Sequence, residues 1–175
     1  MRHCLIYLFF GLACFSCRKD GIIYKPKRPV VIDISGIAEK DINANPLGGE
    51  DKTDWQTDTI LPDTVIHLFN TRLTEVDYSF LADVYQISEP VFFPNPLVNN
   101  ATFRFEVSDA CGLKYFIVNA QLEVLVESFV KLPKGRHNIA FNLSALPPNF
   151  YRLYYGFYNN NGKIYRVGWG DLLKQ

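Results

Sequence analysis

Strict alternation of apolar and polar residues at 102–107 constrains the fold of this chain more than any other feature. The segment reads Thr-Phe-Arg-Phe-Glu-Val, which places Phe103, Phe105 and Val107 on one side of an extended chain and three polar side chains on the other. Because successive side chains of a strand point to opposite faces, this period of two predicts a strand with one buried face. Similar runs lie at 113–118, 122–130, 137–143, 150–158 and 163–169.

Short segments containing Asn, Asp, Gly or Pro separate these runs, at 109–112, 119–121, 133–135, 147–149 and 159–162. Asn161-Gly162 gives the most specific signal, because this pair accepts the positive φ angles of a type I′ hairpin turn. Short strands at this spacing, with no helical stretch between them, predict an all-β, antiparallel β-sandwich.

Composition places this sandwich in the C-terminal part of the chain. Residues 78–175 contain 19 aromatic residues, whereas residues 18–77 contain three. The first part combines few aromatics with Pro, Gly and spaced Asp, which is typical of a segment that cannot bury enough surface to order itself. We therefore expect a largely unstructured, flexible tether over 17–63, an ordered lead-in segment over 64–89 and a sandwich of about seven strands over 90–175.

Three short segments outside the sandwich have patterns of their own. Residues 30–34 (Val-Val-Ile-Asp-Ile) are the one stretch of the tether that resembles a strand able to add to a sheet. In the lead-in segment, the apolar run at 65–69 predicts a short strand. Apolar residues at helical spacing between 71 and 84 predict a helix or a loop.

The first twenty residues predict export. A basic start precedes an apolar run from Leu5 to Phe15, which is shorter than the about twenty residues of a membrane-spanning helix and is typical of a secretory signal. Ser16-Cys17, followed by the polar residues 18–20, resembles the lipobox of bacterial lipoproteins. The resemblance implies a signal peptide over 1–16, cleavage before Cys17 and a covalent lipid on that cysteine. An ordinary signal peptide is the alternative.

The other cysteines fit this interpretation. Cys4 and Cys14 lie in the leader and Cys17 is the residue expected to carry lipid, so Cys111 remains without a disulfide partner. Several acyl chains hold a protein more firmly than one, so we expect stable anchoring in the outer membrane. We expect no cofactor besides this covalent lipid. The sequence leaves open whether the domain faces the periplasm or the cell surface.

Two tripeptides predict a modification of the segment that follows. Asp58-Thr59-Ile60 and Asp63-Thr64-Val65 resemble the Asp-Ser/Thr-aliphatic O-glycosylation site of bacteria with type IX secretion. The resemblance makes Thr59 and Thr64 candidate glycosylation sites.

The C-terminal half also resembles a known family. The motifs that carry the resemblance are, in order, Phe93-Pro94-Asn95-Pro96, the strand at 102–107, Leu132-Pro133-Lys134-Gly135-Arg136-His137, Leu143-Ser144-Ala145-Leu146-Pro147 and Phe150-Tyr151-Arg152-Leu153. Over about residues 90–175 this order resembles the type IX secretion C-terminal sorting domain, which implies an Ig-like sandwich. Pro148-Asn149 replaces the family's Gly, and the last strand lacks its Lys- and Val-rich composition. With the lipobox, these departures favour a resident envelope lipoprotein over secreted cargo.

Residues suited to catalysis are few. The equal numbers of basic and acidic residues, 18 each, give no sign of a nucleic-acid-binding face. His67 and His137 are too far apart for a zinc motif, so no metal site is predicted. Cys111 with His137 is the one conceivable nucleophile–base pair, and Glu123 with Glu127 the one carboxylate pair. A small residue at the core edge and a wet strand face explain these residues better, so we expect no enzymatic activity.

The last hairpin gives the strongest indication of a function. With Asn161-Gly162 at the centre of its turn, Tyr158 lies opposite Tyr165 and Tyr154 opposite Trp169, while the other face of the hairpin is also apolar. A two-layer sandwich has only one inside, so the face of these four aromatic residues is a candidate interaction face. We therefore expect an accessory subunit that docks on an integral outer-membrane β-barrel protein or complex. Carbohydrate binding and type IX secretion cargo are the alternatives.

Overall fold

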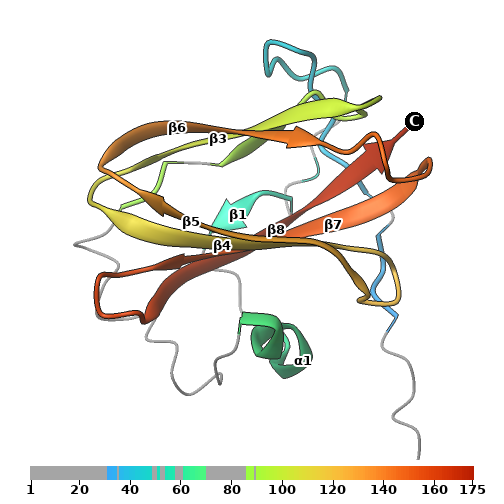
Figure 1. Cartoon of the computed structure of the whole chain (residues 1–175). Coiled ribbons are helices and arrows are strands. Elements are labelled where there is room, and N and C mark those ends of the chain that lie inside the picture. Colours follow the sequence, from blue (N-terminus) through green and yellow to red (C-terminus); the bar gives the residue numbers. More distant parts are fainter. Residues whose placement is uncertain are drawn as a thin grey trace, which may run out of the picture.

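The computed structural model describes residues 31–34, 36–48, 51, 54–57, 61–69, 86–88 and 90–175. Within these residues the chain forms two antiparallel sheets that face each other (Figure 1). The strands are β1 (Gln56–Thr57), β2 (Val91–Phe93), β3 (Asn100–Val107), β4 (Cys111–Val118), β5 (Val124–Leu132), β6 (Gly135–Asn142), β7 (Asn149–Tyr158) and β8 (Ile164–Lys174). A helix of one turn, α1 (Asp63–Ile66), continues into the 3-10 turn η1 (His67–Phe69).

The order of the strands identifies the fold. One sheet has the order β1-β8-β7-β4-β5 and the other β2-β3-β6. The seven strands β2–β8 therefore divide in the way of an immunoglobulin-like sandwich, with the first, second and fifth facing the third, fourth, sixth and seventh. At the start of β7 the Tyr151 hydroxyl donates a hydrogen bond to the Pro147 carbonyl at 2.7 Å, which is the tyrosine corner of such sandwiches. The predicted all-β, Ig-like sandwich is confirmed.

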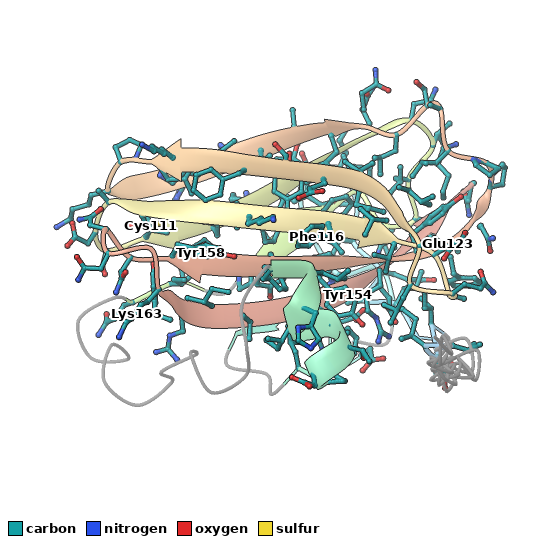
Figure 2. The ribbon with its side chains drawn as sticks, turned by 60° about the horizontal axis from the view of Figure 1, so that its bottom comes forward. Cys111, Phe116, Glu123, Tyr154, Tyr158 and Lys163 are labelled. Carbon is teal, nitrogen blue, oxygen red and sulfur yellow. The ribbon has the colours of Figure 1, made fainter. Side chains whose placement is uncertain are left out.

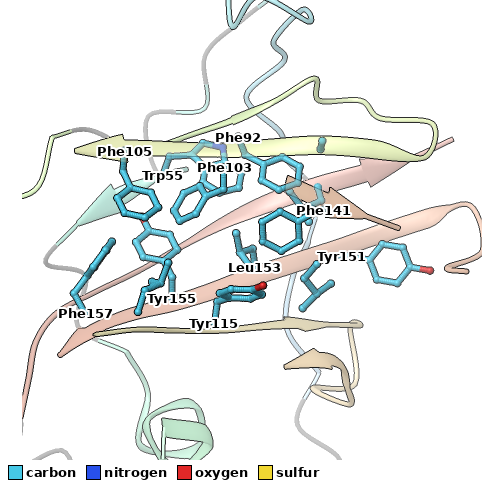
Figure 3. Packing of buried hydrophobic residues seen from close by; sticks show 14 of the residues in the cluster. Trp55, Phe92, Phe103, Phe105, Tyr115, Phe141, Tyr151, Leu153, Tyr155 and Phe157 are labelled. Carbon is cyan, nitrogen blue, oxygen red and sulfur yellow. The ribbon is translucent and has the colours of Figure 1, made fainter. Parts of the chain in front are cut away.

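The alternating strand supplies the centre of the core. In β3 the side chains of Phe103, Phe105 and Val107 are at most 1% exposed, whereas Glu106 on the opposite face is exposed. Figure 3 shows how these rings meet the aromatic side chains of β7 between the two sheets. The Phe103 and Tyr155 ring centroids lie 5.1 Å apart, and those of Phe105 and Phe157 lie 5.2 Å apart. Aromatic pairs at such distances add to the free energy gained by burying their area.

The turn between β7 and β8 differs from the predicted type I′ turn. The Gly162 N–H donates to the Asn159 carbonyl at 2.9 Å, which makes Asn160 and Asn161 the central residues of the turn. Gly162 follows them with a φ of 76°, and the register of the two strands shifts further along, between the Phe157–Arg166 and Tyr158–Ile164 pairs. This is a turn with an adjacent glycine bulge, a hairpin form that inserts one extra residue.

The lead-in segment is helical where we predicted a strand at 65–69. Leu61, Val65, Ile66 and Phe69 are all at most 3% exposed. Their separations of four, one and three residues place them on one side of a helical turn. A run of five residues is too short for its pattern to distinguish the two structures, and packing against a flat sheet face decides for the helix. The helix or loop predicted between 71 and 84 lies outside the described residues.

The described part of the predicted tether belongs to the sandwich, which corrects that expectation. The Trp55 side chain is 8% exposed and its ring stacks on that of Phe92, with the centroids 5.4 Å apart. β1 adds to the edge of the larger sheet by pairing Gln56 with Trp169. Burial of this large aromatic side chain helps to hold a segment of otherwise low hydrophobicity on the sandwich. The strand expected at 30–34 is absent from residues 31–34, although the Ile32 N–H donates to the Ala120 carbonyl at 2.9 Å.

Candidate functional site

The four residues of the predicted interaction face do not lie on one face. Tyr154 and Trp169 are directly opposite each other in β7 and β8, as expected. The register shift between Phe157 and Tyr158 puts Ile164, rather than Tyr165, opposite Tyr158. Tyr165 therefore points into the core between the sheets, where it is 1% exposed, and it is a core residue rather than part of an exposed face.

The outer face of the larger sheet is apolar, as predicted, and its middle is occupied by the chain itself. Tyr154 packs with Phe116 of β4 and with the buried side chains of α1 and η1, and it is 2% exposed. The Phe69 and Phe116 rings meet edge to face with their centroids 5.0 Å apart. The Tyr158 hydroxyl donates to the Phe69 carbonyl at 3.1 Å. Figure 2 shows α1 lying across this face beside Tyr154, so a partner has no access to the predicted centre of the face.

A buried ion pair lies next to this covered region. Arg152 donates to both carboxylate oxygens of Asp171, through Nε at 2.5 Å and Nη2 at 2.7 Å. Nη2 also donates to the Asp33 carbonyl at 2.7 Å, and the guanidinium lies 3.9 Å from the centre of the Trp169 ring. Because three oxygens and an aromatic ring hold the guanidinium, its role is to position neighbouring segments rather than to bind a ligand. The same contact covers one face of the Trp169 ring.

Asp54 connects the N-terminal segment to β8. Its carboxylate accepts hydrogen bonds from the Ala38 N–H at 2.9 Å and from the Asp171 N–H at 3.0 Å. Burial raises the pKa of Asp54 to about 7, against the lowering effect of these two backbone donors. Burial disfavours the charged form of a carboxyl group, which places its titration near neutral pH.

Exposed apolar side chains lie on two loops that are joined by backbone hydrogen bonds. Lys40 and Asn95 exchange backbone hydrogen bonds of 2.8 and 2.9 Å, which join segment 38–48 to the loop before β3. Ile42, Leu47 and Val98 on these loops are 74%, 62% and 62% exposed, and we call them the rim patch. Ile42 also lines a pocket of about 350 Å³ whose other walls include Phe93, Pro94, Ala101 and Phe141.

A second exposed apolar region lies along β5, which is an edge strand of the larger sheet. Val124, Leu125 and Phe129 are 40%, 41% and 51% exposed. Lys114 of β4 forms an ion pair with Glu127 at 3.1 Å on the same face as Phe129. The end of this strand borders a pocket of about 350 Å³ lined by Cys111, Phe129, Tyr158 and Lys131, among other residues.

The residues considered for catalysis have separate partners. Burial raises the pKa of the Cys111 thiol, whose hydrogen-bond partner is Tyr165. His137 Nε2 lies 2.7 Å from the Pro133 carbonyl. Glu123 accepts a hydrogen bond from the Asn119 amide at 2.6 Å and precedes β5, whereas Glu127 pairs with Lys114. A structural role accounts for each of these contacts.

Within the described part of the chain, no three His, Cys, Asp or Glu side chains come together in a way that suits a metal ion. Nor does it contain a helix with the length and hydropathy needed to cross a membrane.

The residues predicted to be modified fall mostly elsewhere. Cys17 and Thr59 lie outside the described residues. Thr64 is the second residue of α1 and is half-buried. The pattern that suggested glycosylation therefore coincides, at this position, with the start of the helix that covers the sheet.

Comparison with known proteins gives a weak structural likeness. No family model matches the sequence, and no curated protein matches it. Among solved structures, the chain is similar to the CARDB domain of the PF1109 protein from Pyrococcus furiosus, which was crystallised in complex with di-metal ions. The identity is 15% and the TM-score 0.33, over 57% of this chain and 100% of that one. The fold assignment rests on the strand order and the tyrosine corner, not on this likeness.

Proposed function

We propose that this chain is a non-enzymatic lipoprotein, anchored in the outer membrane by a lipid on Cys17, which serves as an accessory subunit of an outer-membrane protein complex. The leader, with its resemblance to a lipobox, supports the anchor. The rim patch carries the proposed docking, since Ile42, Leu47 and Val98 are strongly exposed and Ile42 lines a partly apolar pocket. Exposed apolar clusters of this kind are typical of protein-binding surfaces.

The rim patch replaces the aromatic face as the proposed docking surface. Tyr154 is covered by α1, and Arg152 covers one face of the partly buried Trp169 ring, so the two rings do not form an open aromatic face. Ile42 lines a pocket of about 350 Å³, which is large enough to accept one or two side chains of a partner. We propose an integral outer-membrane β-barrel protein as that partner.

The test is co-purification from detergent-extracted envelopes, with each recovered protein identified by mass spectrometry and confirmed by a reciprocal pull-down. We expect an integral outer-membrane protein to be recovered, and we expect Ile42→Asp with Leu47→Asp to abolish its recovery. Val31→Asp is the matched control, because Val31 is 66% exposed on a different segment. Equal recovery with the double variant and the control contradicts the proposed docking surface.

The anchor has its own test. Mass spectrometry of the purified native protein is expected to find an acylated Cys17 as the first residue. Cys17→Ala is expected to release the chain from the membrane fraction. An unmodified amino terminus at another residue contradicts the anchor and leaves the docking test unaffected. Protease treatment of intact cells determines which side of the outer membrane the domain faces.

A further inference from the structure

The free edge of β5 is unusual among the four sheet edges of the described structure. The edges formed by β1 and β2 have two and three residues, which is a common protection against unwanted pairing. The edge at β6 has eight residues and presents exposed Arg136, Asn138 and Ala140. β5 has nine residues and exposes Val124, Leu125 and Phe129. A long edge with exposed apolar side chains favours pairing with another strand.

The regular part of β5 is symmetric about Phe129. Residues from Leu132 back to Val126 pair one-to-one with β4, and the register then shifts at Leu125. At the other end Pro133, which lacks an N–H, follows the strand. The regular segment therefore extends three residues on each side of Phe129. Two copies of such a segment match end to end only when they run antiparallel with Phe129 on a twofold axis.

Two charged residues of β5 are also placed symmetrically about Phe129. Glu127 lies two residues before Phe129 and Lys131 two residues after it, on the same face of the sheet. In the antiparallel register centred on Phe129, each Glu127 is directly opposite Lys131 of the other copy. Directly opposite charges of unlike sign stabilise a strand pair, and like charges destabilise it. A shift that centres the pair on Glu127 places two carboxylates opposite each other.

From these observations we propose that β5 binds β5 of a second copy of this chain, antiparallel and with the two Phe129 side chains facing each other. The two larger sheets then join into one continuous sheet. On its outer face, Lys114, Glu127 and Lys131 of the second copy form a row of alternating charge. This inference goes beyond the proposed function, because it uses residues other than the rim patch and holds whether or not that patch binds a β-barrel.

Disulfide trapping of the full chain in membranes tests the register. Directly opposite residues have Cα atoms about 4.5–5.5 Å apart, within the range of a disulfide. We expect Phe129→Cys to give a covalent dimer after mild oxidation. Glu127→Cys alone and Lys131→Cys alone place their thiols about 13 Å apart and are expected to give none. Glu127→Cys and Lys131→Cys produced together are expected to give a linked dimer.

Zero-length carbodiimide coupling tests the same contact in the unaltered protein, mixed from two isotopic labels. We expect a link between Glu127 of one copy and Lys131 of the other, because within one copy these residues are about 13 Å apart along the strand. The ion pair of Glu127 with Lys114 at 3.1 Å is expected to couple within one copy and serves as the positive control.

Charge reversal completes the test. Glu127→Lys is expected to lower dimer trapping at Phe129→Cys by about tenfold, since it replaces two attractive pairs by two repulsive ones, and adding Lys131→Glu is expected to restore it. Glu106→Lys is the matched control, because it removes an exposed ion pair with Arg136 on the other sheet. If the Glu127–Lys131 link between copies is missing while the Lys114 link forms, or if every cysteine variant is trapped equally, β5 does not pair with itself.

Discussion

The contact between Phe69 and Gly156 gives the sharpest test of how α1 is held on the sheet. A Cβ atom on Gly156 would lie 2.8 Å from Cε1 of Phe69, which is closer than carbon atoms approach without displacement. The Phe69 side chain is 3% exposed and meets Phe116 edge to face. Removal of a buried phenyl ring costs about 3–5 kcal/mol. We expect about 3 kcal/mol for Phe69→Ala, since a short surface segment relaxes more easily than a core.

Gly156→Ala is expected to destabilise the native chain because the new methyl group pushes the Phe69 ring away. In the Phe69→Ala background the same substitution meets no ring, so we expect it to cost nothing there. The double-mutant cycle is therefore expected to give a coupling free energy of at least about 1 kcal/mol. The assay is chemical denaturation of the full chain, with exposed His67→Ala as the control in η1. Additive effects of the two substitutions refute the packing of Phe69 over Gly156.

Three further predictions concern stability. Burial raises the pKa of Asp54 to about 7 in the folded chain, so this carboxyl group ionises at a lower pH in the unfolded chain than in the folded one. The free energy of unfolding is therefore expected to fall as the pH rises from about 4 to 7. Asp54→Asn is expected to flatten this part of the pH profile in denaturant titrations. Gly170→Ala places a methyl group 2.4 Å from the Trp55 ring and is expected to lower the melting temperature and shift the tryptophan emission to longer wavelength. Tyr151→Phe removes the hydrogen bond to the Pro147 carbonyl and is expected to cost about 1 kcal/mol in chemical denaturation.

Residues whose burial follows a simple period could be predicted from the sequence. β3 was identifiable because its three apolar residues alternate with polar ones that face solvent or the outer sheet surface. The pairing of Tyr154 in β7 with Trp169 in β8 could also be predicted, because the pattern of the hairpin is long enough to fix most of the register of its two strands. These features depend on local periodicity, which a single sequence contains.

Residues whose role depends on a distant part of the chain could not be predicted in this way. Trp55 lies in a segment with the composition of a linker, and only the space above Gly170 makes it a core residue. The register shift between Phe157 and Tyr158 puts Tyr165 on the inner face, because one inserted position moves a side chain to the other side of a strand. Neither effect has a signature within a few residues.

The apolar outer face of the larger sheet explains why the predicted docking surface differs from the proposed one. A sheet that is apolar on both faces needs a cover on each, and a sandwich supplies only one. The second apolar face was recognisable from the sequence, but a sequence does not say whether a partner or another part of the chain covers that face. Here α1 and η1 cover it over β4 and β7, and they stop before β5, where Phe129 stays exposed. Within the described residues, most of the exposed large apolar side chains lie at this sheet edge or in the rim patch, and Val31 and Phe150 are the others. The sheet edge and the rim patch are the two places where this chain has most to gain from binding a protein.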